Sequence, residues 1–366
     1  MERQAWVSMI QEATEARDFR ELRSLRERAH EMFLRHLPTN PPFEWNGEVN
    51  RFHDLVIGRT IAMTECMVCE ERNEQVPIPY AFLLFGSGGR MEQTLWSDQD
   101  SGLVYEDAPD EELRLRAELF FETLAGRVSA NLELVGYPLC SGGVLCTNEK
   151  WRRPLSSYMQ MVNGWLQNPD WENVRYLLIV ADLRCIHGER YLADRLMGNL
   201  LSYVQKHPAM YGHMQQNTLH HKVSIGIFGQ LIKERYGEDA GGVDVKYGAY
   251  IPIVNGVRLL ALEAGIRATS TEGRIRSLMV GGHVPEDIGH DWLDALSIAL
   301  RLRSTTPFQI EDGQYTSRGM LTPELLTRSR TSELKMCLRI AGELQKFVKK
   351  SVTTEIENSK RSGESE

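Results

Sequence analysis

The sequence predicts an α+β protein in which a small α/β unit with a mixed sheet is flanked by a helical N-terminal segment and an all-helical C-terminal domain. Apolar residues recur at helical spacing over 1–75. Short runs of strand-forming residues alternate with a helical pattern over 76–150, and helical patterns dominate over 151–350. The end of the chain, 351–366, is polar and unpatterned, which predicts a disordered tail.

Each predicted element has a local signal. Asp18 and Glu21 form a capping-box pair, and the apolar pattern that follows ends at a group of prolines near residue 40. A second helical pattern covers 52–71. In the α/β unit we expect strands over 80–85, 102–105 and 144–147, a short helix over 90–95 and an amphipathic helix over 111–134.

A glycine-rich turn follows the first expected strand. Gly86 allows a sharp backbone turn, and Ser87, Gly88 and Gly89 would leave free N–H groups at the start of the helix over 90–95. Such a helix start attracts phosphate. A plain surface turn is the alternative for these four residues alone. No Gly-Lys-Ser/Thr follows, so the turn is not a Walker P-loop.

Two acids, Asp98 and Asp100, precede the second expected strand. Side chains two residues apart on an extended segment project to the same side, so both carboxylates can reach the same ion or ion pair. Mg²⁺ prefers such oxygen ligands and keeps waters and substrate phosphates as its other ligands. An ordinary turn capped by Ser97 and Asp98 is the alternative. The upstream strand and turn favour a metal site, and we expect two ions, Mg²⁺ or Mn²⁺.

The motif G-S-x-x-R-x-E, followed by S-D-x-D and an apolar strand, resembles the nucleotidyltransferase superfamily, in the branch of PII-protein uridylyltransferases and glutamine synthetase adenylyltransferases. The chain resembles more closely a bacterial family of nucleotidyltransferases, often fused to CBS-pair or cyclic-nucleotide-binding domains. The likeness covers about 50–345 and includes three further segments: 136–140 with Asn148, Trp151 and Arg152; 182–184 with Gly188; and 244–255 with Arg258.

The resemblance implies a nucleotidyltransferase-type fold and a metal-dependent reaction. A nucleoside monophosphate would pass from ATP or UTP to a protein side chain or a small molecule, with release of pyrophosphate. Gly86, Ser87 and Gly88 would bind the β or γ phosphate, and Arg90 would add positive charge as the transition state develops. Glu92 either fixes Arg90 or lies exposed in the first helical turn.

A third carboxylate, which many members of the superfamily add from a later strand, is not evident. The expected strand over 144–147 carries no acid. Asp182 is the candidate for this catalytic role, and its alternatives are a pair with Arg184 or a helix cap. Without a third acid, the chain could bind nucleotide without turning it over.

A polar segment interrupts the apolar C-terminal pattern. Lys246 and Arg258 could contact the triphosphate or an acidic acceptor, and Asn255 shares a helical face with Arg258 through its i, i+3 spacing. An interdomain set of salt bridges is the alternative.

Two other patterns suggest metal sites without further support. Cys66 and Cys69 have the spacing of zinc or redox motifs, but no second pair and no spaced histidines accompany them, so we favour reduced, packed thiols. His220 and His221 are interpreted as surface or cleft histidines.

Composition restricts the class of protein. The 366 residues allow two domains, and 42% hydrophobic with 25% charged residues is ordinary globular usage. No apolar run approaches the ~18 residues of a membrane span, and the N-terminus lacks the apolar core of a signal peptide. We therefore expect a cytoplasmic protein without a membrane partner. The net charge of −8 argues against tracking of nucleic acid.

Two functions remain open at this stage. The first is an active nucleotidyltransferase, for which the expected partners are ATP or UTP, an acceptor and a second copy of the chain in a homodimer. The second is a nucleotide-binding regulatory protein that has lost turnover. An RNA-end binder is a weaker third, because the basic stripe it needs is not visible in the sequence.

Overall fold

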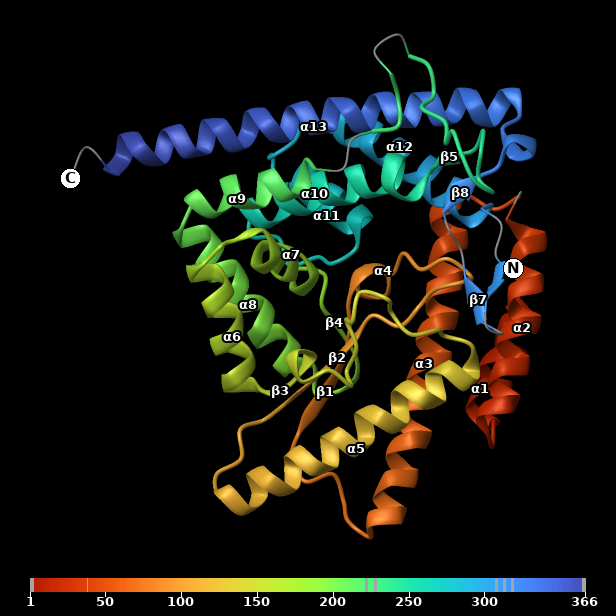
Figure 1. The fold of residues 1–366 in the computed structure, drawn as a ribbon, viewed down its shortest axis with the longest axis vertical. Helices are drawn as coiled ribbons and strands as arrows, with labels where there is room; N and C mark the ends of the chain where they lie inside the picture. Colours follow the sequence, from red (N-terminus) through yellow and green to blue (C-terminus); the bar gives the residue numbers. More distant parts are fainter. Residues whose placement is uncertain are drawn as a thin grey trace. The chain divides into compact units, whose positions relative to one another are not determined.

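The computed structural model describes residues 3–363 except Pro38, 221–222, 227–228, 307–308, 312–313 and 317–318. The chain forms two compact units (Figure 1). Unit 1 covers Met1–Met161, Asp182–Leu196 and Phe308–Thr316, and unit 2 covers Val162–Ala181, Met197–Pro307 and Ser317–Glu366. Each unit is described by itself below.

Four long helices of unit 1 pack around a small sheet: α1 (Arg3–Glu15), α2 (Phe19–His36), α3 (Pro42–Arg72) and α5 (Glu111–Val135). The predicted capping box at the start of α2 is confirmed. The Asp18 carboxylate accepts hydrogen bonds from the N–H groups of Arg20 and Glu21, and the Glu21 carboxylate accepts one from the N–H of Arg17. These helices and the sheet share one apolar core, which includes Phe52, Phe82 and Phe120.

The sheet of unit 1 is mixed, as predicted, with the order β3-β2-β1-β4. Its central strands are antiparallel, and both are buried along their whole length. β4 also runs antiparallel to β1, whereas β3 runs parallel to β2. The strands are β1 (Tyr80–Leu84), β2 (Ser101–Tyr105), β3 (Arg152–Pro154) and β4 (Arg184–Gly188).

The strand predicted over 144–147 is wrong. The Val144 carbonyl accepts a hydrogen bond from the N–H of Ser101, but the next contact joins the Cys146 N–H to the Ser101 hydroxyl, so the segment lies beside β2 without forming a ladder. The two outer strands of the sheet come from Arg152–Pro154 and Arg184–Gly188 instead. The residues of both strands are only partly buried or exposed. Positions of this kind do not require apolar side chains, so neither strand has the apolar run that would predict it.

Helices dominate the chain after β3, as predicted. They are α6 (Leu155–Gln167), α7 (Trp171–Val180), α8 (Arg190–Lys206), α9 (Ala209–Thr218), α10 (Ile251–Glu263), α11 (Thr271–Val280), α12 (Glu286–Ser304) and α13 (Arg328–Gly363). A π-helical turn, η2 (Lys246–Tyr250), leads directly into α10, and α13 packs against α10 and α12. Short 3-10 turns occur at η1 (Glu149–Trp151) and η3 (Pro323–Leu325). The short strands are β5 (Val243–Asp244), β6 (Gln309–Glu311), β7 (Gln314–Thr316) and β8 (Met320–Leu321).

The C-terminal segment differs from the predicted disordered tail, because α13 continues as a helix to Gly363. Extending a formed helix by one residue costs far less than nucleating a new one, so a polar segment can continue a helix that packing has already fixed. Residues 364–366 lie outside the described part of the chain.

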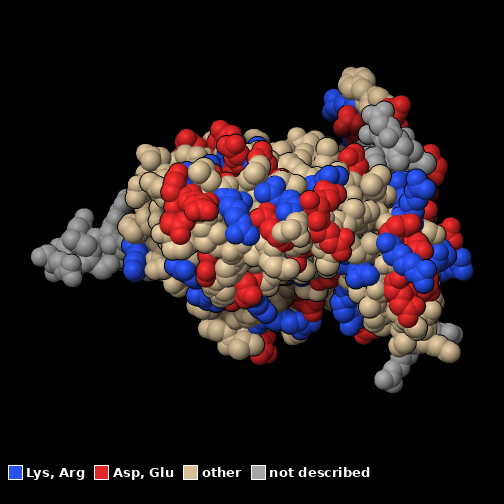
Figure 2. Space-filling view, turned by 90° about the horizontal axis from the view of Figure 1, so that it is seen from below, with Lys and Arg blue, Asp and Glu red and all other residues tan. Residues whose placement is uncertain are grey.

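Within the described part of the chain, every helix is too short or too polar to cross a membrane. On the face drawn in Figure 2, acidic and basic side chains are interspersed.

Candidate active site

The glycine-rich turn is itself a helix, α4 (Gly86–Gly89), which corrects the helix predicted over 90–95. The N–H of Gly89 donates to the Phe85 carbonyl, and the N–H of Arg90 donates to the Gly86 carbonyl. Met91 then adopts a positive φ of 57°, which ends the helix. The N–H of Gly89 is therefore used inside the protein, and the N–H groups of Gly86, Ser87 and Gly88 are the first of the helix.

Two of these glycines are required by close approaches. Gly86 has a φ of +51°, and a Cβ there would collide with the Asp100 carboxylate. A Cβ at Gly89 would collide with the backbone oxygen of Asp182. The glycines thus allow α4 to lie against Asp100 on one side and against the Asp182 backbone on the other.

Asp98 and Asp100 form a cluster with Cys140, in which ligand atoms of the three side chains all lie within 4.8 Å of one another. The N–H of Gln99 donates to the Pro138 carbonyl at 2.8 Å, which brings the Cys140 loop beside the two acids. Burial, the charge of Asp100 and a hydrogen bond to its carboxylate raise the pKa of the Cys140 thiol to about 12. Cys140 is therefore a thiol at neutral pH, and the carboxylates supply the negative charge of the cluster.

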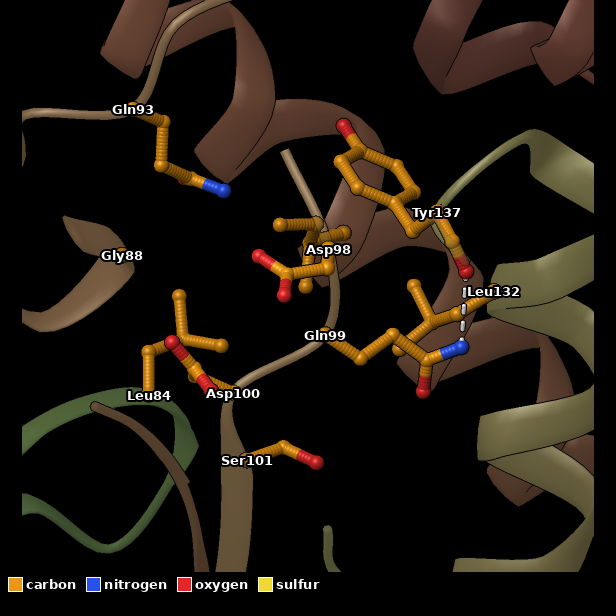
Figure 3. Close-up of a pocket in the computed structure, with 10 residues that line it drawn as sticks. Leu84, Gly88, Gln93, Asp98, Gln99, Asp100, Ser101, Leu132 and Tyr137 are labelled. Carbon is orange, nitrogen blue, oxygen red and sulfur yellow. Dashed lines mark hydrogen bonds between the residues drawn. The ribbon is translucent and has the colours of Figure 1, made fainter. Parts of the chain in front are cut away.

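A small cavity of about 10 Å³ lies beside the two acids, with room for about one water-sized ligand (Figure 3). Gln93 and Gln99 both line it, but their side chains differ in hydrogen bonding. The Gln99 amide donates to the carbonyls of Ser129 and Tyr137. The Oε1 of Gln93 is buried without a hydrogen-bond partner among the described residues. In Figure 3 the amide nitrogen of Gln93 lies on the side of the Asp98 carboxylate.

Gln93 is held in place through its backbone. Its N–H donates to Asn50 Oδ1 at 2.8 Å, and its carbonyl accepts from the amides of Asn46 and Asn50 at 3.2 Å each. Cys140 and Gln93 are both absent from the residues predicted for the site. Gln93 follows the R-x-E part of the motif directly, and Cys140 lies in a segment that carries the resemblance, but neither position indicates a spatial partner.

Arg90 lies inside unit 1, with 4% of its surface exposed. Its Nε donates to Glu92 at 2.9 Å and its Nη1 to Asp182 at 2.5 Å, and both carboxylates are buried. The interpretation of Glu92 as the residue that fixes Arg90 is confirmed. The guanidinium thus pairs with two acids, and the nucleotide contact expected for Arg90 stays a prediction.

The Asp182 carboxylate forms an ion pair with Arg90, and not with Arg184 as one alternative suggested. Arg184 forms a bidentate pair with Asp54 and donates to the Gly88 carbonyl at 2.9 Å. Among the described residues, the cluster with metal-ligand geometry contains Cys140 and not Asp182. Asp182 and Arg184 therefore hold α4 in place from β4 and the residues just before it.

A buried polar cluster connects α2 and α3 to the loop that carries Asp98. The guanidinium of Arg26 lies 4.2 Å from the Tyr137 ring centroid and donates to the carbonyls of Leu95 and Gly136. The His53 ring nitrogens lie 2.8 Å from the Tyr137 hydroxyl and 3.0 Å from the Thr94 carbonyl. Arg26 and His53 thus fix the segments on both sides of the acid cluster.

His53 and a second buried histidine, His30, whose ring centroids lie 5.8 Å apart, predict a pH-dependent stability. Burial, followed by the charge of Arg26, lowers the pKa of His53 to about 3 and holds that of His30 well below its usual value. Between pH 6.5 and 3 the unfolded chain binds protons that the folded chain does not, so stability falls as pH falls. Each histidine contributes up to about 1.4 kcal/mol per pH unit. We expect His53→Gln to flatten the slope of unfolding free energy between pH 6.5 and 4 in urea titrations. An unchanged slope would contradict this assignment.

The remaining predicted residues belong to unit 2. Lys246 lies in η2 with its Nζ 5.3 Å from the Tyr247 ring centroid, and Arg258 is buried in α10. Asn255 and Arg258 line one cavity, which confirms that they share a helical face. His220 lines the same cavity, and His221 lies outside the described residues.

The cysteines carry no disulfide in the described chain. Cys66 is exposed and Cys69 is partly buried, so packing is confirmed only for Cys69 of this pair.

Two family models match the chain. One, "Putative nucleotidyltransferase DUF294", matches residues 41–172, and the other, "Putative nucleotidyltransferase substrate binding domain", matches residues 208–352. The chain belongs to this nucleotidyltransferase family. The predicted resemblance is therefore confirmed, and membership implies nucleotidyl transfer and a nucleotide substrate. The first match includes the α4 turn, both acids and Cys140, whereas Arg26 and His30 precede it. No curated protein matches the chain.

Proposed function

We propose that the protein is a metal-dependent nucleotidyltransferase that transfers AMP or UMP from ATP or UTP to a protein side chain or a small-molecule acceptor. The observation that supports this most strongly is the position of α4. The Asp100 carboxylate lies against Gly86, the first residue of α4, where any side chain would collide with that carboxylate. A phosphate-binding helix start and a candidate metal ligand are thus adjacent.

The donor set fits a divalent cation such as Mg²⁺ or Mn²⁺. Asp98 and Asp100 supply two carboxylates. Gln93 lines the adjoining cavity, and its buried Oε1 is an additional neutral oxygen without a hydrogen-bond partner among the described residues. The soft sulfur of Cys140, the third member of the cluster, is a poor ligand for such hard ions. When bound, a pair of such ions lowers the pKa of the acceptor hydroxyl and neutralises the charge that develops on pyrophosphate.

Other residues of the chain would bind the triphosphate and hold α4 in position. The Ser87 hydroxyl and the N–H groups of Gly86 and Gly88 would bind oxygens of the β or γ phosphate. The acceptor oxygen would then form a bond to the α-phosphorus as the bond to pyrophosphate breaks, and the hydroxyl proton would pass to solvent. Arg90 would keep α4 in position through its pairs with Glu92 and Asp182.

The role of Gln93 predicts a change in metal affinity. We expect Gln93→Met to weaken Mn²⁺ binding about 10-fold, because a thioether of similar length replaces the amide oxygen. Gln93→Glu should strengthen binding, since it adds a third carboxylate. Electron paramagnetic resonance of free Mn²⁺ measures both affinities without any activity assay. If both variants bind Mn²⁺ like the wild type, Gln93 is not a ligand.

A direct assay tests the proposed function. The purified protein is incubated with each nucleoside triphosphate, Mg²⁺ or Mn²⁺, and cell extract as the source of acceptor. We expect pyrophosphate release with ATP or UTP, together with label from the α-phosphate on an acceptor. Nucleotide binding without release in every combination would exclude transfer.

Nucleotide binding without pyrophosphate release would favour a nucleotide-binding regulatory protein. The pairing of Asp182 with Arg90 supports this alternative, because it leaves two carboxylates in the described ligand cluster. The acceptor, the homodimer and a cytoplasmic location remain predictions.

A further inference from the structure

Unit 2 contains an open cavity of about 310 Å³ whose lining residues lie outside the acid cluster of Asp98, Asp100 and Cys140. Its walls come from α7, the end of α9, η2 and α10. The lining residues are Trp171, Arg175, Leu178, Ile179, Asn217, His220, Tyr247, Ile251, Asn255 and Arg258. The volume lies at the lower end of the range for small-molecule sites.

The charge of this lining is positive. Arg175 and Arg258 are its charged residues, and no described lining residue is acidic. Arg258 has 6% of its surface exposed, and its Nη1 donates to the Leu178 carbonyl at 3.2 Å, which fixes the guanidinium relative to α7. Arg175 is exposed. A fixed and an accessible guanidinium in one cavity, with the amide of Asn255 beside them, favour a phosphate or carboxylate ligand.

Two aromatic side chains give the cavity a second property. Trp171 and Tyr247 remain 53% and 46% exposed although both line it. The His220 ring packs edge-on against Trp171, and the Asn217 amide donates to the Trp171 carbonyl, so the start of α7 is held against the end of α9. Tyr247 is presented by the π-helical turn η2, a type of turn that is frequent at functional sites. Exposed aromatic faces beside arginines suit a planar ring.

We propose that this cavity binds a mononucleotide, with its phosphate on Arg175 and Arg258 and its base against Trp171 or Tyr247. The site belongs to unit 2 alone. Binding at this site does not depend on nucleotidyl transfer, because the site uses none of the groups around Asp98.

The test is calorimetric titration of the full-length protein with AMP and UMP in EDTA, which removes metal-dependent binding at the acid cluster. Adenosine and inorganic phosphate are titrated separately. We expect AMP or UMP to bind at least about 10-fold more tightly than either fragment, because each fragment engages half of the site. We expect Arg175→Gln and Trp171→Ala each to weaken that binding at least about 10-fold.

Matched controls on the same unit are Arg276→Gln and Tyr236→Ala. Arg276 lies exposed on α11 and pairs with Glu272, and Tyr236 is 80% exposed, and neither lines the cavity. Both variants, and Asp98→Asn in unit 1, should bind the mononucleotide like the wild type. The proposal is overturned if neither AMP nor UMP binds at millimolar concentration, if Arg175→Gln behaves like Arg276→Gln, or if Asp98→Asn abolishes binding. Binding of phosphate alone with the same affinity would overturn the role of the base.

Discussion

Replacing Asp98 or Asp100 by asparagine is expected to lower pyrophosphate release at least about 10³-fold while the protein stays folded. Both side chains lie in the ligand cluster, and Asp98 is exposed, so the amide fits without repacking. A metal ion that stabilises developing charge contributes several kcal/mol to a reaction, and each 1.36 kcal/mol is tenfold in rate. Initial rates of release with saturating triphosphate, and Mn²⁺ affinity measured in parallel, check the prediction.

Asp107→Asn is the matched control. Asp107 follows β2 in the same unit and is exposed, and its carboxylate accepts hydrogen bonds from the N–H and hydroxyl of Ser156. An asparagine retains an oxygen for these bonds, so release should remain within about twofold of the wild type. If Asp98→Asn keeps both its rate and its Mn²⁺ affinity, the acid cluster is not the metal site. If it loses Mn²⁺ and keeps its rate, transfer does not depend on this metal site.

The parts of the site that the sequence predicts are those that lie close together in the chain. Asp98 and Asp100 are two residues apart, and α4 ends at Gly89, nine residues before Asp98, so local geometry brings the phosphate cradle and the acids together. Cys140 and Gln93 were missed because their places depend on distant pairs. The Cys140 loop is placed by the bond from Gln99 to Pro138, and Gln93 is clamped by Asn46 and Asn50 of α3.

In the fold, too, the elements with local sequence patterns were predicted and those that depend on long-range contacts were not. The buried runs of β1 and β2 and the long amphipathic helices carry strong local patterns, and their prediction is confirmed. β4 escaped prediction because its residues are only partly buried or exposed, and because two strands and the helices α4, α5, α6 and α7 separate it from β1 in the chain. The segment over 144–147 has the composition of a strand, but its contacts with Ser101 use one side-chain hydroxyl where a ladder needs backbone groups. Sheet membership is decided by such long-range partners, which no window of sequence contains.

Arg90→Met is expected to destabilise unit 1 by about 3–5 kcal/mol, the usual cost of removing one partner from a buried ion pair. The methionine fills much of the space but leaves the buried carboxylates of Glu92 and Asp182 without this counter-ion. Since Asp182 also borders α4 at Gly89, the loss should loosen the helix that carries Ser87. Hydrogen exchange of the α4 and β1 amides, measured beside urea unfolding, would show the effect within unit 1.

Arg114→Met provides the control, because Arg114 also pairs with two acids, Glu111 and Glu118, but on the exposed surface of α5. Solvent screens that pair, so its removal should change unfolding and exchange far less than the loss of Arg90. Arg90→Lys separates charge from geometry: a lysine keeps the positive charge but cannot reach both carboxylates with a planar fork, so intermediate stability is expected. Equal effects of Arg90→Met and Arg114→Met would mean that burial does not determine the strength of the Arg90 pairs. Stability would then come from the packing of α4 against Leu84 and the Asp182 backbone, which Gly88 and Gly89 permit.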